Sequence, residues 1–189
     1  IRSCLVGSEM CIRDSATDVK VFSRKEAYPS IQVKVTQGAI TVDTNIKYME
    51  NATEGLDPGY DVGNFGGTVF DVYTRLVSGA TSQDFTLQSL PNANYEDMVI
   101  PLGIKSKARE EVTVSMNVAN LPTGIEVYLE DRVLGTETKL SDAKAVYKVT
   151  FEAASEGVGR FFIYTKSKAL SVTEVNRANT NIYTTANKQ

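Results

Sequence analysis

The chain has 189 residues, of which 42% are apolar and 23% charged, and its net charge is −3. This composition is ordinary for a globular domain. The acidic balance and the lack of a Lys/Arg cluster exclude a phosphate-binding stripe, so we expect no nucleic-acid partner. No apolar run approaches the roughly 20 residues of a membrane-spanning helix, so we expect no membrane insertion. The absence of histidine and tryptophan removes the commonest general base and metal ligand and the best sugar-stacking side chain.

Residues 1–15, IRSCLVGSEMCIRDS, resemble a peptide that arises when sequencing-adapter DNA is translated by mistake. The alternative is a short natural leader, but the segment has no apolar core and carries Glu9 and Asp14, unlike a secretory signal. We therefore interpret it as non-native and exclude it from the fold. Both cysteines, Cys4 and Cys11, lie inside it. The rest of the chain therefore has no disulfide framework, thiolate nucleophile or zinc ribbon.

Period-two alternation of apolar and polar residues dominates from Ile31 to Thr165 and predicts strands with one buried face. The clearest case is 112–118, in which Val112, Val114 and Met116 alternate with polar residues. Pro101 interrupts its run and indicates an edge or bulged strand. The nine alternating runs are 31–36, 45–48, 70–76, 85–87, 100–104, 112–118, 125–129, 147–151 and 161–163.

Turn residues separate these runs, for example Pro122 with Gly124 and Glu156 with Gly157, at intervals typical of an all-β domain. About nine strands cannot all pair in one flat sheet, so we predict an all-β fold. Its expected form is an antiparallel β-sandwich of two sheets, jelly-roll or immunoglobulin-like. A closed barrel is the alternative. The predicted domain covers 16–170, and 171–189 reads as a linker followed by the start of another strand.

One stretch, Asn51–Gly67, has five glycines and no strand alternation, and loops of this length are usually functional or disordered. With the nearby Glu50, it concentrates oxygen-bearing side chains. The four candidate calcium ligands in the loop are Glu54, Asp57, Asp61 and Asn64. Calcium takes six to eight oxygen ligands in irregular geometry, although no EF-hand pattern is present. The alternative is a solvated loop in which Asp57-Pro58-Gly59 forms a turn. We expect no other cofactor.

Adjacent acids at Glu130 and Asp131 do not suit glycoside hydrolysis, because neighbours on a strand point to opposite faces. Asp131 shares the core-facing parity of Val127 and Leu129 and therefore needs a partner. We predict a structural ion pair with Arg160, for which Arg75 competes. We identify no catalytic residue, so the chain is not expected to be an enzyme.

Four aromatic residues are candidates for stacking on sugar rings: Tyr60, Phe65, Tyr73 and Tyr95. The alternative is that they are singly scattered aromatic residues, which are normal on the surface of a sandwich.

Six segments in order resemble an accessory module found in large secreted proteins of Bacteroidota, mainly flavobacteria, immediately before a type IX secretion sorting domain. The segments are NATEGLDPGYDVGNFGG, DVYTRL, DFTLQSLP, VIPLGI, VYLEDR and GRFFIYT. The tail LSVTEVNRANTNIYTTANKQ resembles the linker and first strand of that sorting domain. The resemblance covers about residue 31 to the end.

This resemblance implies export and an extracellular or cell-surface location, with the type IX secretion machinery as a partner through a sorting domain that this chain lacks. It implies a non-catalytic accessory or structural role. The alternative function is adhesion, with an extracellular glycan or protein bound on the Asn51–Gly67 side of a calcium-stabilised module.

Overall fold

A computed structural model describes residues 28–79 and 82–167. Eleven strands and one short 3₁₀ helix, with no α-helix among these residues, confirm the all-β prediction. The elements are β1 (Ser30–Gln37), β2 (Ile40–Met49), β3 (Val62–Gly63), β4 (Asp71–Thr74), β5 (Phe85–Pro91), η1 (Tyr95–Asp97), β6 (Val99–Lys105), β7 (Glu111–Ala119), β8 (Ile125–Asp131), β9 (Thr136–Lys139), β10 (Val146–Thr150) and β11 (Phe161–Ser167).

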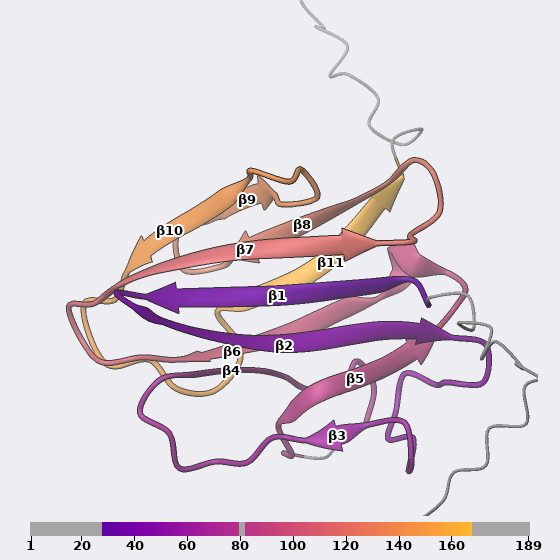
Figure 1. The fold of residues 1–189 in the computed structure, drawn as a ribbon, viewed down its shortest axis with the longest axis horizontal. Helices are drawn as coiled ribbons and strands as arrows, with labels where there is room; N and C mark the ends of the chain where they lie inside the picture. Colours follow the sequence, from indigo (N-terminus) through magenta and orange to yellow (C-terminus); the bar gives the residue numbers. More distant parts are fainter. Residues whose placement is uncertain (1–27, 80–81, 168–189) are drawn as a thin grey trace, which may run out of the picture.

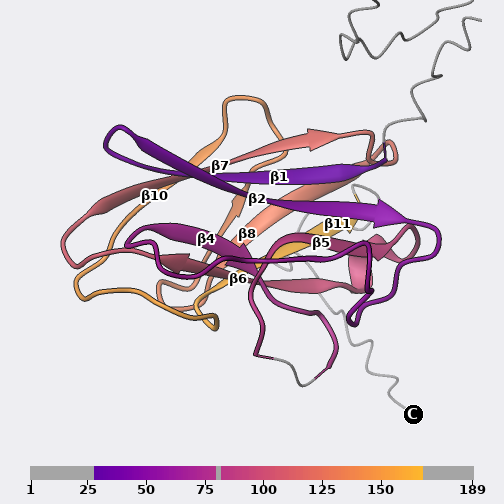
Figure 2. The same ribbon diagram turned by 60° about the horizontal axis from the view of Figure 1, so that its bottom comes forward.

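The strands form one continuous sheet in the order β10-β7-β1-β2-β5-β4-β6-β11-β8-β9, with β3 paired to β5. This sheet folds over on itself, so β7, β1 and β2 lie in front of β8, β11 and β6 (Figure 1), and a second view separates the same layers (Figure 2). The two packed layers of a sandwich are thus parts of a single sheet that approaches a barrel.

All nine alternating runs form strands, and the two strands without such a run are the short β3 and β9. One pairing departs from the antiparallel pattern, because β2 and β5 run parallel. The edge-strand interpretation of Pro101 is wrong, since β6 lies between β4 and β11. The Pro101 carbonyl accepts a hydrogen bond from the Arg75 amide, just beyond the last β4 residue, Thr74. The missing N–H of proline would point to the same residue, Arg75, and the ladder between β4 and β6 ends just before this position, at the pair of Thr74 and Leu102.

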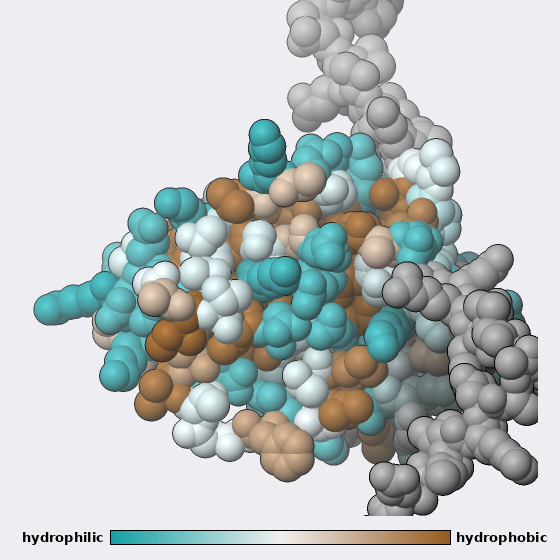
Figure 3. Space-filling model, viewed as in Figure 1, coloured by the Kyte–Doolittle hydropathy of each residue, from teal (hydrophilic) through white to brown (hydrophobic). Residues whose placement is uncertain are grey.

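The core lies between the layers and is built from the inward-facing residues of the alternating runs. Val33 on β1, Val114 on β7, Leu102 on β6 and Ile163 on β11 are all fully buried in one cluster. The opposite parity faces solvent, and Figure 3 shows polar and apolar residues mixed over the face of β7, β1 and β2. This arrangement follows from strand geometry, because successive side chains of a strand point to opposite faces of the sheet.

Both ends of the described domain lie beside one turn. Ser30 at the start of β1 pairs with Ala119, and Ser167 at the end of β11 pairs with Ile125, so the two ends flank the turn between β7 and β8. We call this the entry end; the opposite, far end carries the β1–β2 turn and lies at the left in Figure 1. The interpretations of 1–15 and 171–189 concern segments outside the described residues. Within those residues, no helix has the length and apolar character needed to cross a bilayer.

Tyr73 on β4 packs over a glycine on the neighbouring strand. It is 4% exposed, pairs in register with Gly103 of β6, and its hydroxyl accepts a hydrogen bond from the Gly157 amide at 2.8 Å. A Cβ at position 103 would overlap the Tyr73 ring. Gly103 is therefore required by this ring, not by its backbone conformation.

We predict that Gly103→Ala destabilises the domain by about 1–3 kcal/mol through overpacking. Gly66→Ala is the matched control, because a Cβ there would meet no atom. Urea unfolding of both variants measures the difference. In a Tyr73→Ala background the cost of Gly103→Ala should shrink; an unchanged cost would contradict the assignment to the ring.

Candidate functional site

The predicted ion pair between Asp131 and Arg160 is present. Arg160 Nη2 lies 2.7 Å from Asp131 Oδ2, and Arg160 Nε lies 3.0 and 3.1 Å from the two carboxylate oxygens. Arg75 pairs instead with Asp84 at 2.8 Å. The side chain of Asp131 has no exposed surface, while that of Arg160 is 23% exposed. The core-facing parity of Asp131 therefore identified the buried acid, and of the two candidate partners Arg160 is the one that binds it.

Three further donors form hydrogen bonds with the Asp131 carboxylate. The Tyr147 hydroxyl donates to Oδ2 at 2.8 Å, and the amides of Val133 and Leu134 donate to Oδ1 at 3.0 and 3.2 Å. Burial raises the pKa of Asp131, but the hydrogen bonds from Arg160 and Tyr147 outweigh that effect and hold the pKa below its ordinary value. The carboxylate is thus kept ionised and fully bonded, which is the environment of a structural anion.

We predict that Arg160→Ala lowers the free energy of unfolding by about 3–5 kcal/mol, because it leaves a buried charge without its cation. Lys34→Ala is the control, since Lys34 is exposed on the polar face of β1. Thermal and urea midpoints of the two variants provide the comparison. Equal, small losses would contradict a structural role for the pair.

The same ion pair predicts that the stability of the domain falls at low pH. Because the folded-state pKa of Asp131 lies below the unfolded value of about 3.9, its contribution is complete above that pH and is lost as pH falls through the folded-state pKa. Urea midpoints at successive pH values below about 4 should therefore fall more steeply in the parent chain than in Asp131→Asn. Identical slopes would show that other carboxylates govern acid unfolding.

The acids of the Asn51–Gly67 loop bond mainly to backbone amides. Asp57 Oδ2 accepts from the Thr53 amide at 2.6 Å, and Asp61 Oδ2 accepts from the Asp57 amide at 2.8 Å. Asp61 Oδ1 accepts from the amide of Ser89 on β5 at 2.7 Å. These bonds fold the loop into successive turns and attach it to β5.

The four predicted calcium ligands do not converge. Asp57 and Asp61 share one turn, and Glu54 is exposed. The side-chain amide of Asn64 donates to the Asp71 carboxylate at 2.9 Å. No group of three or more His, Cys, Asp or Glu residues in 28–79 and 82–167 is arranged to hold a metal ion. The calcium hypothesis stays a prediction, and the contacts give Asp57 and Asp61 a structural role without it.

We expect Asp61→Ala to lower stability by about 1–3 kcal/mol, because it leaves the Asp57 and Ser89 amides without acceptors. The loss should be equal in calcium and in chelator, and Glu54→Ala should have no effect in either. Thermal melting of both variants in the two buffers measures this. A loss seen only with calcium present, in both variants, would instead support the metal site.

Two of the four candidate stacking aromatics are packing residues. Tyr73 is buried over Gly103, and Tyr95 lies against Tyr48 with ring centroids 4.6 Å apart. Phe65 is 89% exposed and Tyr60 is 42% exposed. The sequence could not separate these cases, because only Tyr73 lies on a strand, whereas Tyr60 and Phe65 lie in the long loop and Tyr95 in η1.

Tyr60 lines a pocket of about 220 Å³ at the entry end. Tyr28, which is 38% exposed, contributes a second half-exposed aromatic ring to this pocket. The lining residues are Tyr28, Lys47, Met49, Gly59, Tyr60, Val62, Leu87 and Ser89. The loop that the sequence singled out therefore contributes to an apolar and aromatic depression, which we call the entry-end pocket.

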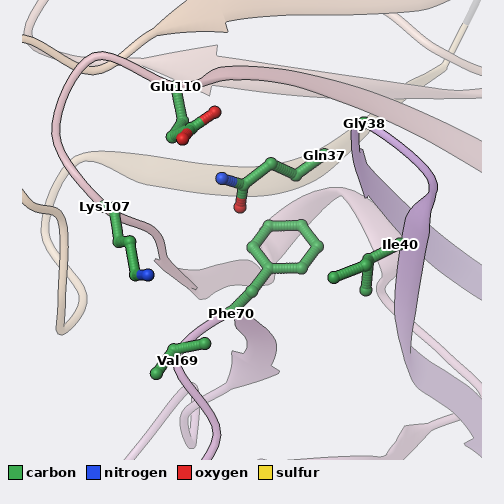
Figure 4. A pocket seen from close by; sticks show the side chains of 7 residues that line it. All are labelled: Gln37, Gly38, Ile40, Val69, Phe70, Lys107 and Glu110. Atoms are coloured by element: carbon green, nitrogen blue, oxygen red, sulfur yellow. The ribbon is translucent and has the colours of Figure 1, made fainter.

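A second pocket of about 220 Å³ lies at the far end, where three separate segments meet (Figure 4). They are the β1–β2 turn, the segment before β4 and the connection between β6 and β7. The lining residues are Gln37, Gly38, Ile40, Val69, Phe70, Lys107 and Glu110. We call this the far-end pocket. Sequence reasoning missed it, since no single segment carries more than three of its residues.

Comparisons with known proteins identify no relative: no protein-family model, curated protein or solved structure matches this sequence.

Proposed function

We propose that this chain is a non-catalytic accessory module of a protein exported by type IX secretion to the cell surface or the extracellular medium. The observation that supports this proposal best is the position of the two ends. The start of β1 and the end of β11 flank one turn, so both ends of the described domain lie at the entry end. A module attached in this way can be carried beside different passenger domains.

The use of charged groups also favours a structural role. Asp131 is paired with Arg160 and hydrogen-bonded to Tyr147, and Asp61 attaches the long loop to β5. Lys139 and Lys166 pair with Glu126 and Glu137 on the outer face of the sheet. Each of these acids has a bonded partner that fixes its position, which suits a rigid scaffold.

Antibody labelling tests the proposed location. An antibody against residues 28–167 should label intact cells of a flavobacterial host that makes the full-length parent protein. In the same host without type IX secretion machinery, the labelling should disappear and the antigen should accumulate in the periplasm. Antigen that stays cytoplasmic in both strains would overturn the export proposal.

The purified chain should in addition show no turnover of polysaccharide, ester or peptide substrates.

The entry-end pocket supports a second candidate, the binding of an extracellular saccharide. Two half-exposed tyrosines stand in one depression with Lys47. Aromatic faces provide apolar area for a sugar ring, and the Lys47 ammonium can donate hydrogen bonds to its hydroxyls.

A glycan array tests this candidate. If the pocket binds saccharide, Tyr60→Ala should abolish the signal, whereas Phe65→Ala, which removes a more exposed ring outside the pocket, should retain it. Loss of binding in both variants, or no bound glycan for the parent chain, would eliminate this candidate and leave the structural role.

A further inference from the structure

The far-end pocket has an apolar side and a polar side. The Phe70 side chain forms the centre of the apolar side, with Ile40 and Val69 beside it (Figure 4). Phe70 is only 6% exposed, whereas Ile40 and Val69 are 59% and 65% exposed. A ligand with an apolar side chain would remove this aliphatic surface from water, which is the main driving force for small-ligand binding.

The polar side carries one cation, one anion and one amide. The Gln37 amide, the Lys107 ammonium and the Glu110 carboxylate surround the space beside the Phe70 ring (Figure 4). In the described parts of the chain none of these three groups has a side-chain hydrogen bond or ion pair, and Lys107 and Glu110 do not pair with each other. Lys105, two residues before Lys107, does pair, with Glu156 at 3.0 Å. The pocket therefore keeps both charges available.

This combination selects for one chemical class. An anion alone would be repelled by Glu110, and a cation alone by Lys107. A ligand that carries both charges close together satisfies both groups, and the Gln37 amide can bond either end. The pocket volume of about 220 Å³ is smaller than the roughly 300–1,000 Å³ of drug-sized sites, so the ligand must be small.

We propose that the far-end pocket binds a free α-amino acid with an apolar side chain. Lys107 and the Gln37 N–H groups receive the carboxylate, Glu110 receives the ammonium, and the side chain lies on Phe70 between Ile40 and Val69. This proposal does not depend on the export route or on the saccharide candidate, because it uses a different end of the domain.

Titration of the ¹⁵N-labelled full chain with L-phenylalanine tests the proposal by NMR. Saturable shifts are expected at 37–40, 69–70 and 107–110, in the millimolar range. Three analogues separate the contributions: phenethylamine keeps only the ammonium, hydrocinnamate keeps only the carboxylate, and N-acetylphenylalanine amide has neither charge. Each should bind more weakly than phenylalanine. Equal binding of the uncharged amide would overturn the zwitterion assignment, and shifts absent or confined to other residues would overturn the site.

Substitutions provide a second readout. Lys107→Met and Glu110→Gln should each weaken phenylalanine binding by roughly two- to fivefold, as expected for exposed ion pairs. Lys34→Met is the matched control, because it removes an exposed lysine of the β1 face, and should leave affinity unchanged. Melting curves verify that all three variants fold. Unchanged affinity in both pocket variants would contradict the proposal.

Discussion

The buried carboxylate of Asp131 is the constraint on which closure of the sheet depends. The sheet ends at β9 on one side and β10 on the other, and in the described residues no backbone ladder joins these two strands. Tyr147 of β10 instead bonds Asp131 at the end of β8, while Arg160 reaches it from the start of β11. A fully buried charge is tolerated only with all its partners in place. The interaction therefore specifies how the three strands meet, more than it adds net stability.

The long glycine-rich segment carries the chain from the end of β2 back to the start of β4, before β5 pairs in parallel with β2. Met49 ends β2 at the entry end, and a parallel strand can begin only after the chain has returned toward the far end. The segment makes this return along β5, because Val62 pairs with Leu87 and Gly63 with Phe85. Two hydrogen bonds hold the same path: the Ser89 amide donates to the Asp61 carboxylate, and the backbone amide of Asn64 donates to the Asp84 carbonyl. These contacts give the segment a place in the sheet architecture as a connection between β2 and β4.

Sequence reasoning succeeded where the cause was local. Alternation predicted the nine main strands, and the parity of Asp131 predicted a buried acid paired with Arg160. It failed where a feature depends on the pairing of strands that are distant in the sequence. Nothing near Ile46 indicates that its neighbour is Gln88 in a parallel strand, and Pro101 is tolerated in an interior strand only because β4 ends at Thr74. The far-end pocket could not be predicted for the same reason, since its residues become neighbours only after folding.

The distribution of ion pairs explains why the far-end pocket keeps unpaired charges. Across the outer face of β8 and β11, Tyr128 stacks on Tyr164 at 5.8 Å, and Lys166 lies 5.0 and 5.2 Å from the two rings while it pairs with Glu137. Cross-strand neighbours are held in register, so outward side chains of opposite character satisfy one another. Connecting segments have no such register, and groups such as Lys107 and Glu110 are left without partners. The connection between β6 and β7 therefore keeps the charges that line the far-end pocket.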